Sequence, residues 1–154
     1  RHTSTNNREY LYFFQVGEWD YMMIFSEIHI AGEYHVAFKA KKKEEHHLRY
    51  RVDVETNTGQ MRKIIATVMN ILEDNYEMIK KQRQQSIDNL KRLGYNMEKV
   101  APPIIYLFTG QRKKRSNGVP TRTKLYLKYI QQRFPTWEIE PGDDNQIIIH
   151  TDTK

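Results

Sequence analysis

The chain has 154 residues, the length of a single domain, and it contains no cysteine, which excludes a disulfide framework, a thiolate zinc site and a cysteine nucleophile. No apolar run reaches the ~20 residues that a membrane-spanning helix requires. The formal net charge is +6, but residues 111–133 hold eight basic residues and no acidic one, so the rest of the chain sums to 6 − 8 = −2 and the positive charge is local.

The first third of the chain carries alternating and aromatic patterns that are typical of strands. Residues 1–8 are polar and lack periodicity, so we expect a flexible N-terminal arm there and a single domain over residues 9–154. Gly17 and Glu18 separate two aromatic runs and predict a hairpin. Two further runs alternate between apolar and polar residues. The four strands are expected at residues 9–16, 19–30, 33–40 and 48–55.

The clearest periodic signal follows the turn TNTG (residues 56–59), where Asn57 or Thr58 is the expected N-cap of a helix. Apolar residues recur there at spacings of three and four and predict an amphipathic helix of about twenty residues. Residues 80–95 either extend this helix or form a second one, and Gly94 is the expected stop. The apolar stripe consists of Met61, Ile64, Ile65, Val68, Leu72, Tyr76 and Ile79.

The last third of the chain alternates between strand and helix patterns. Residues 102–110 form a short apolar run after two prolines, which predicts a buried central strand. A helix is expected to open at Pro120 and Thr121 and to end at Pro135. Two short strands at residues 137–140 and 146–150 flank the turn PGDDN and predict a closing hairpin.

The order of these elements predicts the fold class. Four strands are followed by one or two helices, a strand, a helix and two strands. We therefore expect an α+β domain, a mostly antiparallel sheet with two to three helices packed on one face.

Three blocks of the sequence resemble a family of small, uncharacterised proteins that tailed bacteriophages encode. The likeness covers about half of the chain, and Lys80–Val100 looks like an insertion relative to the family. Thr-Gly also stands where the family has Ser-Ala after the short strand, and Thr121 stands where it has Ser. The resemblance implies a phage origin, in the host cytoplasm or the virion, and implies no reaction. The matching positions are Thr56 to Gly59, Ala66 to Val68, Ile105 to Thr109, Arg122, Lys124, Leu125 and Tyr126.

The basic stretch is the strongest functional signal. A local excess of cations attracts polyanions, of which nucleic acid is the commonest, with an acidic protein surface or an anionic membrane as other partners. The expected helix start at Thr121 adds a partial positive charge and free N–H groups. No aromatic residue lies within 111–121, so any contact is expected to be with the backbone rather than the bases. The expected phosphate contacts are Arg112, Lys113, Lys114, Arg115, Arg122, Lys124, Lys128 and Arg133.

Two other interpretations of the basic stretch need no ligand. The first is a solvated surface. The second is an internal clamp, in which acids of the C-terminal hairpin neutralise part of the neighbouring basic helix. The hairpin acids are Glu138, Glu140, Asp143 and Asp144.

Enzymatic chemistry finds little support in the residues. A ribonuclease H-like nuclease needs carboxylates on neighbouring strand ends to hold two metals. Asp20 and Asp53 lie on expected strands, with Glu55 near, but the expected central strand carries no acid. Tyr126 and Tyr129 lie on a helix as nicking tyrosines do, but the histidines lack the spacing of the metal ligands such enzymes use. We predict no cofactor, no metal and no catalytic residue.

The sequence thus predicts a non-enzymatic accessory protein that binds the nucleic-acid backbone through residues 111–133. The alternatives are a virion structural component, a phage factor that binds and inhibits a host protein, and a metal-dependent nuclease.

Overall fold

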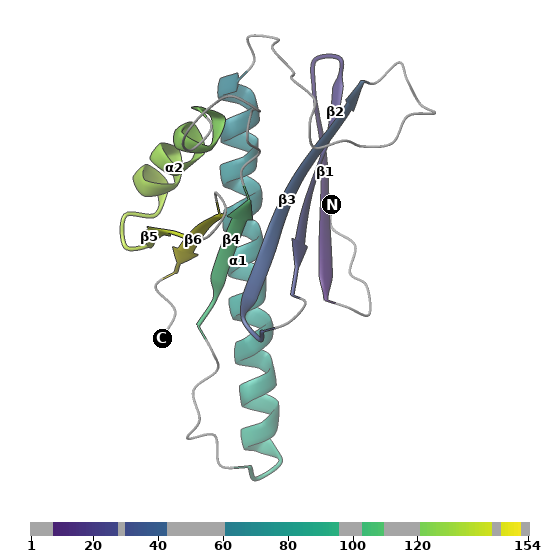
Figure 1. The fold of residues 1–154 in the computed structure, drawn as a ribbon. Coiled ribbons are helices and arrows are strands. Elements are labelled where there is room, and N and C mark those ends of the chain that lie inside the picture. Colours follow the sequence, from purple (N-terminus) through teal and green to yellow (C-terminus); the bar gives the residue numbers. More distant parts are fainter. Residues whose placement is uncertain are drawn as a thin grey trace.

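The computed structural model of the chain describes residues 8–27, 30–42, 61–95, 103–109, 121–142 and 146–151, without the side chains of 109 and 121–124. Six strands and two helices are present in this part (Figure 1). They are β1 (Glu9–Val16), β2 (Trp19–Ser26), β3 (Glu33–Lys42), α1 (Met61–Arg92), β4 (Ile105–Thr109), α2 (Thr121–Arg133), β5 (Glu138–Pro141) and β6 (Gln146–His150).

The six strands form one mixed sheet in the order β1-β2-β3-β4-β6-β5. Every neighbouring pair is antiparallel except β3 and β4, which run parallel. Both helices lie on the same side of the sheet (Figure 1). The predicted α+β class, the mostly antiparallel sheet and the helices on one face are therefore confirmed.

The predicted N-terminal hairpin is confirmed, with Val16 opposite Trp19 across a two-residue turn. Gly17 has φ of 61°, a value that suits the first position of a type II′ turn and that residues with a Cβ rarely adopt. The prediction that the second strand runs to Ile30 is wrong, because β2 ends at Ser26. Glu27 accounts for the end, since its carboxylate accepts a 3.0 Å hydrogen bond from the Gly32 amide and folds the chain back toward β3.

The third predicted strand is confirmed and is two residues longer than expected, because β3 runs on to Lys42. The fourth predicted strand, residues 48–55, lies outside the described residues. So do the expected N-cap residues Asn57 and Thr58 and the N-terminal arm up to residue 7.

Alternation along the strands sends aromatic and aliphatic side chains to the helix side of the sheet. On β3, Tyr34 and Val36 are buried, and Phe38 packs against them on the same face. The burial of one face is what the alternating pattern predicts. The remaining buried residues of the N-terminal three strands are Tyr10, Tyr12, Val16, Trp19, Tyr21, Met23, Phe25 and Ala40.

Helix α1 is one continuous helix of 32 residues, so residues 80–92 extend the predicted helix rather than forming a second one. The predicted stripe is buried from Ile64 to Ile79, with Met61 half-buried at its start. The helix ends at a Schellman motif, in which the Gly94 amide bonds to the Lys91 carbonyl and the Tyr95 amide to the Leu90 carbonyl, both at 3.0 Å. Gly94 has φ of 92°, as the predicted stop requires.

The C-terminal half of α1 projects beyond the sheet (Figure 1). Near the end of the sheet, the Tyr10 hydroxyl of β1 donates a 3.3 Å hydrogen bond to Gln82 of α1. From Gln84 onward, the hydrogen bonds between described residues of α1 stay within the helix or its cap. We call residues 84–95 the α1 extension.

Trp137 joins the C-terminal segment to the core. Its ring stacks on Phe134 with centroids 3.9 Å apart, and it meets the edge of Tyr76 from α1 at 4.9 Å. The ring also stacks on Tyr106 from β4 at 6.0 Å. The predicted central strand and the predicted C-terminal hairpin are confirmed, since β4 lies between β3 and β6 and β5 pairs with β6.

Candidate nucleic-acid interface

The predicted phosphate contacts fall into three groups in the structure. Residues 112–115 lie outside the described residues, and the side chains of Arg122 and Lys124 are not described either. Lys128 is exposed on the outer side of α2. Arg133, at the last position of α2, is tied to another helix.

Arg133 is bound by two side chains of α1. Its Nε atom donates to the Glu73 carboxylate at 2.9 Å, and its Nη2 atom contacts the same carboxylate and donates to Asn70 at 3.1 Å. The acid that neutralises Arg133 is therefore Glu73 of α1, which the internal-clamp interpretation did not include. Glu73 lies 60 positions away in the sequence, which is why no local pattern pointed to it.

One hairpin acid is paired on the neighbouring strand, and two others lie outside the described residues. The Glu140 carboxylate lies 2.8 Å from Nε2 of His150 on the neighbouring strand. Asp143 and Asp144 are not described. Lys128 takes part in no hydrogen bond or ion pair that involves the described side chains.

Helices α1 and α2 begin at the same end of the molecule (Figure 1). Tyr126, in the second turn of α2, packs on Phe38 with ring centroids 6.3 Å apart, in the half of β3 nearer to Lys42. Arg133 at the other end of α2 reaches the middle of α1. The N-termini of both helices, each with a partial positive charge, therefore point the same way.

Neither helix has an acidic residue in its first turn, where acids usually offset the helix dipole. Instead, α1 opens with Arg62 and Lys63, both exposed, and α2 opens with Arg122 and Lys124. Cations at a helix N-terminus are electrostatically unfavourable unless an anion lies nearby. Sequence analysis missed Arg62 and Lys63, and the signal that could have found them is this pair of cations directly after the TNTG turn.

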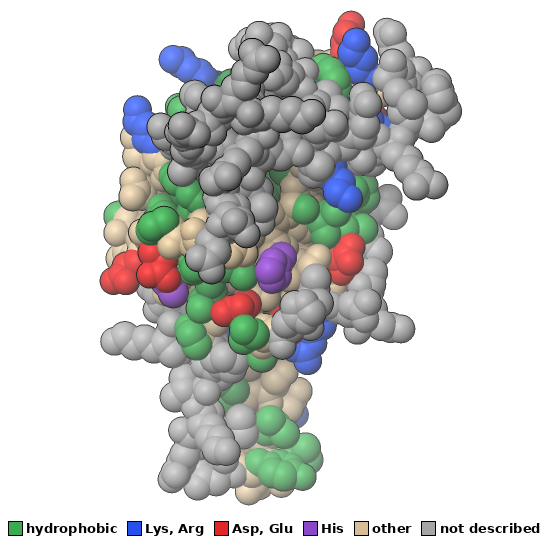
Figure 2. Space-filling model, viewed as in Figure 1, with side chains coloured by type: hydrophobic (Ala, Val, Ile, Leu, Met, Phe, Trp, Pro, Cys, Tyr) green, Lys and Arg blue, Asp and Glu red, His purple; other side chains and the backbone are tan. Residues whose placement is uncertain are grey.

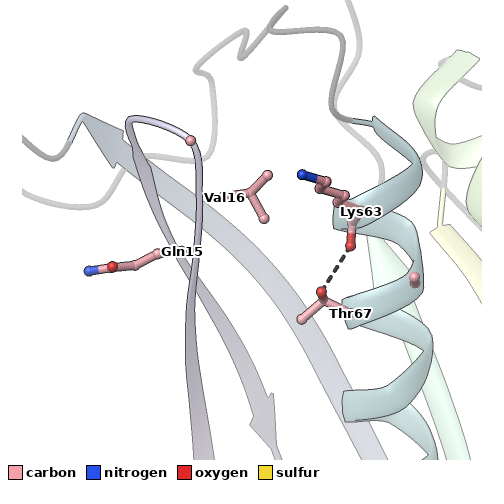
Figure 3. A pocket seen from close by; sticks show the side chains of 6 residues that line it. Gln15, Val16, Lys63 and Thr67 are labelled. Carbon is pink, nitrogen blue, oxygen red and sulfur yellow. Dashed lines mark hydrogen bonds between the residues drawn. The ribbon is translucent and has the colours of Figure 1, made fainter.

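A shallow groove of about 410 Å³ separates the β1–β2 turn from the first turns of α1. Val16 and Lys63 point toward this space from opposite sides, whereas Gln15 points away from the helix (Figure 3). The Thr67 hydroxyl donates a 2.8 Å hydrogen bond to the Lys63 carbonyl on the helix side. The groove therefore places one cation beside the turn.

The end of β3 adds one cation, Lys42, on the helix side of the sheet, the face that also carries the buried Ala40. The Lys42 ammonium lies 5.8 Å from the centroid of the Trp19 ring, a cation–π contact. Lys41 lies on the other face of the sheet, opposite Asp20 in the strand pairing. The basic end of the molecule is defined as Lys42, Arg62, Lys63 and Lys128.

The residues considered for catalysis do not assemble in the described part of the chain. No group of three histidine or acidic side chains positioned to hold a metal occurs among the described residues. Asp53 and Glu55 lie outside them. Tyr126 and Tyr129 pack partly buried against the core, as the amphipathic pattern of α2 predicts.

Comparisons with known proteins identify no relative of this chain. No family model, no curated protein and no solved structure matches it. Among the described residues, no helix is long and apolar enough to cross a membrane.

Proposed function

We propose that this chain is a phage-encoded, non-enzymatic accessory protein of the host cytoplasm or virion that binds the nucleic-acid backbone at its basic end. The proposed contacts within 111–133 are Arg112, Lys113, Lys114, Arg115, Arg122, Lys124 and Lys128, joined by Arg62 and Lys63 of α1. Arg133, a predicted contact, instead holds α2 against α1 through Glu73.

One observation carries this proposal. Helices α1 and α2 begin at the same end of the molecule, and the first turn of each contains cations and no acid. A bound phosphate would satisfy the free N–H groups, the helix dipoles and the cations together. Strand β4 runs parallel to β3, toward this end, and α2 begins at this end with Thr121. Phosphate contacts of this kind fix position without reading sequence.

The test is a fluorescence-polarisation titration of labelled single- and double-stranded DNA and RNA at ~50 and ~200 mM salt. About six phosphate contacts give a log–log salt slope near −5 on duplex DNA. One variant changes Arg112, Lys113, Lys114 and Arg115 to Ala, and a second carries Lys63→Gln. Both are expected to weaken binding and to flatten the salt slope.

The matched control is Lys80→Gln, which removes the same single charge as Lys63→Gln but lies farther along α1. Its ammonium is 3.6 Å from Glu77 and 4.7 Å from the Tyr76 ring centroid. Equal losses of nucleic-acid affinity in Lys63→Gln and Lys80→Gln would mean that binding depends only on the net charge of the protein. Absence of binding at low salt would sink the proposal and favour a virion component or an inhibitor of a host protein, whereas metal-dependent loss of the probe would favour a nuclease.

A further inference from the structure

The tip of the α1 extension exposes large apolar side chains that do not belong to the hydrophobic core. Leu93 is 74% exposed, Tyr95 62% and Leu90 36%. These are three of the five large hydrophobic residues exposed in the described part of the chain. Figure 2 shows hydrophobic side chains gathered at the end of the molecule where α1 projects away from the sheet. Single exposed apolar residues are ordinary, but a cluster marks a contact surface.

The apolar tip has a fixed conformation. The Schellman motif orders the chain through Gly94 and Tyr95 by two backbone hydrogen bonds. The backbone therefore holds Leu93 and Tyr95 in place at the very end of the helix. The helical part of the extension, Gln84–Arg92, is about 14 Å long, so the tip stands clear of the described strands.

Two cations lie beside this tip. Lys91 and Arg92 form the last turn and are exposed, and Lys81 is exposed farther back. The one acid of the extension, Asp88, accepts a 2.9 Å hydrogen bond from Gln84. The last helical turn therefore combines apolar side chains with positive charge and holds no acid.

We propose that the tip of the α1 extension binds the surface of an anionic lipid bilayer, end-on. An anionic bilayer is complementary to the tip in two ways. Its negative headgroups attract Lys91 and Arg92, and the apolar layer beneath them accepts Leu93. Tyr95 suits the level of the headgroups, because its ring is apolar and its hydroxyl is polar. A flat surface that crosses the axis of α1 meets the tip before any described strand (Figure 1).

Nucleic acid fits this tip less well than a bilayer does. It would engage the cations but would leave Leu93 in water. A second copy of the chain would cover the apolar residues but would bring Lys91 and Arg92 of both copies to the same small contact. The inference stands apart from the proposed function, because the tip and the basic end lie at opposite ends of α1.

The test is co-sedimentation of the full chain with vesicles of phosphatidylglycerol and phosphatidylcholine, compared with vesicles of phosphatidylcholine alone. We expect binding to the anionic vesicles only. Leu93→Gln is expected to weaken it about tenfold, the effect of withdrawing one leucine from an apolar layer. Lys91→Gln with Arg92→Gln is expected to weaken it about fivefold for each charge, whereas Leu93→Phe retains it.

Two matched controls make the result specific to the tip. Arg62→Gln with Lys63→Gln removes the same charge at the basic end, and Ile30→Gln removes an equally apolar residue that is 57% exposed in the β2–β3 connection. Both should leave vesicle binding intact. Loss of binding in the Arg62/Lys63 variant alone would overturn the proposal in favour of the basic end. Absence of vesicle binding, with Leu93-dependent self-association in sedimentation velocity, would overturn it in favour of a second copy.

Discussion

The hydroxyl of Tyr106 donates a 2.7 Å hydrogen bond to the Oδ1 atom of Asn75, which joins the middle of the sheet to α1 inside the core. The amide of Asn75 completes the contact by donating to the Tyr12 hydroxyl at 3.2 Å. Asn75 is fully buried, and burial raises the pKa of the Tyr106 hydroxyl well above its ordinary value. The polar contact therefore fixes how α1 sits on the sheet.

Asn75→Leu is expected to destabilise the protein by about 2 kcal/mol, because it leaves the Tyr106 hydroxyl buried without its acceptor. Urea unfolding measures the loss. Adding Tyr106→Phe to Asn75→Leu should recover part of it, since both partners are then apolar. Additive losses in the double variant would show that the two side chains act independently.

The contact of Arg133 with Glu73 gives a second prediction. Both side chains are more than a third exposed, so Glu73→Gln should lower the free energy of unfolding by less than about 1 kcal/mol. The same change removes a carboxylate beside α2 and should strengthen nucleic-acid binding at low salt. Asp88→Asn changes the net charge equally at the other end of α1 and should have no such effect. A gain that persists at high salt would contradict an electrostatic cause.

The carboxyl of Glu27 predicts an acid-dependent loss of stability. Burial alone would raise its pKa, but hydrogen bonds from the Gly32 amide, Tyr34 and Arg8 lower the pKa below its ordinary 4.5 on balance. The stabilisation is thus complete above pH 4.5 and is lost as the pH falls through the lowered pKa. Glu27→Gln should cost about 2 kcal/mol at neutral pH. The difference from the native chain should shrink in urea unfolding below pH 4.5, and a constant difference would contradict it.

Replacing Gly94 is expected to destabilise the end of α1 without changing the stability of the whole protein. A Cβ at this position meets no atom within 4 Å, so only the positive φ opposes Gly94→Ala. We expect a cost of about 1 kcal/mol, confined to the α1 extension. Amide hydrogen exchange should show faster opening of the last helical turn, while urea unfolding stays unchanged. Gly94→Asn should open less than Gly94→Ala, because Asn tolerates this backbone conformation better.

Local patterns accounted for most of the elements. The alternation of residues 33–40 and the stripe from Met61 to Ile79 each follow from which face is buried, so the sequence alone indicates them. The end of β2 at Ser26 did not follow, because it depends on the Glu27 carboxylate finding the Gly32 amide. An apolar pattern such as FSEIHI does not reveal a turn that a single side chain stabilises.

Contacts between distant segments account for what sequence analysis missed at the candidate site. The charge count identified the basic stretch but not that Glu73 neutralises Arg133, since the two residues meet only once α2 lies on α1. Arg62 and Lys63 become candidate phosphate contacts only because both helices begin at the same end of the folded molecule. The sequence predicts helix over residues 80–95, but the exposure of Leu90 and Leu93 there depends on where the sheet ends.

The parallel pairing of β3 with β4 sets the order in which the sheet can form. Strands β1 to β3 are joined by short connections, whereas 105 − 42 = 63 positions separate the end of β3 from the start of β4. Closing so long a loop is entropically costly and slows folding. We expect the N-terminal meander to form early and the central pairing to form late. Until then β3 is an unpaired edge in the middle of the future sheet, and it is the place where a folding chain is most open to aggregation.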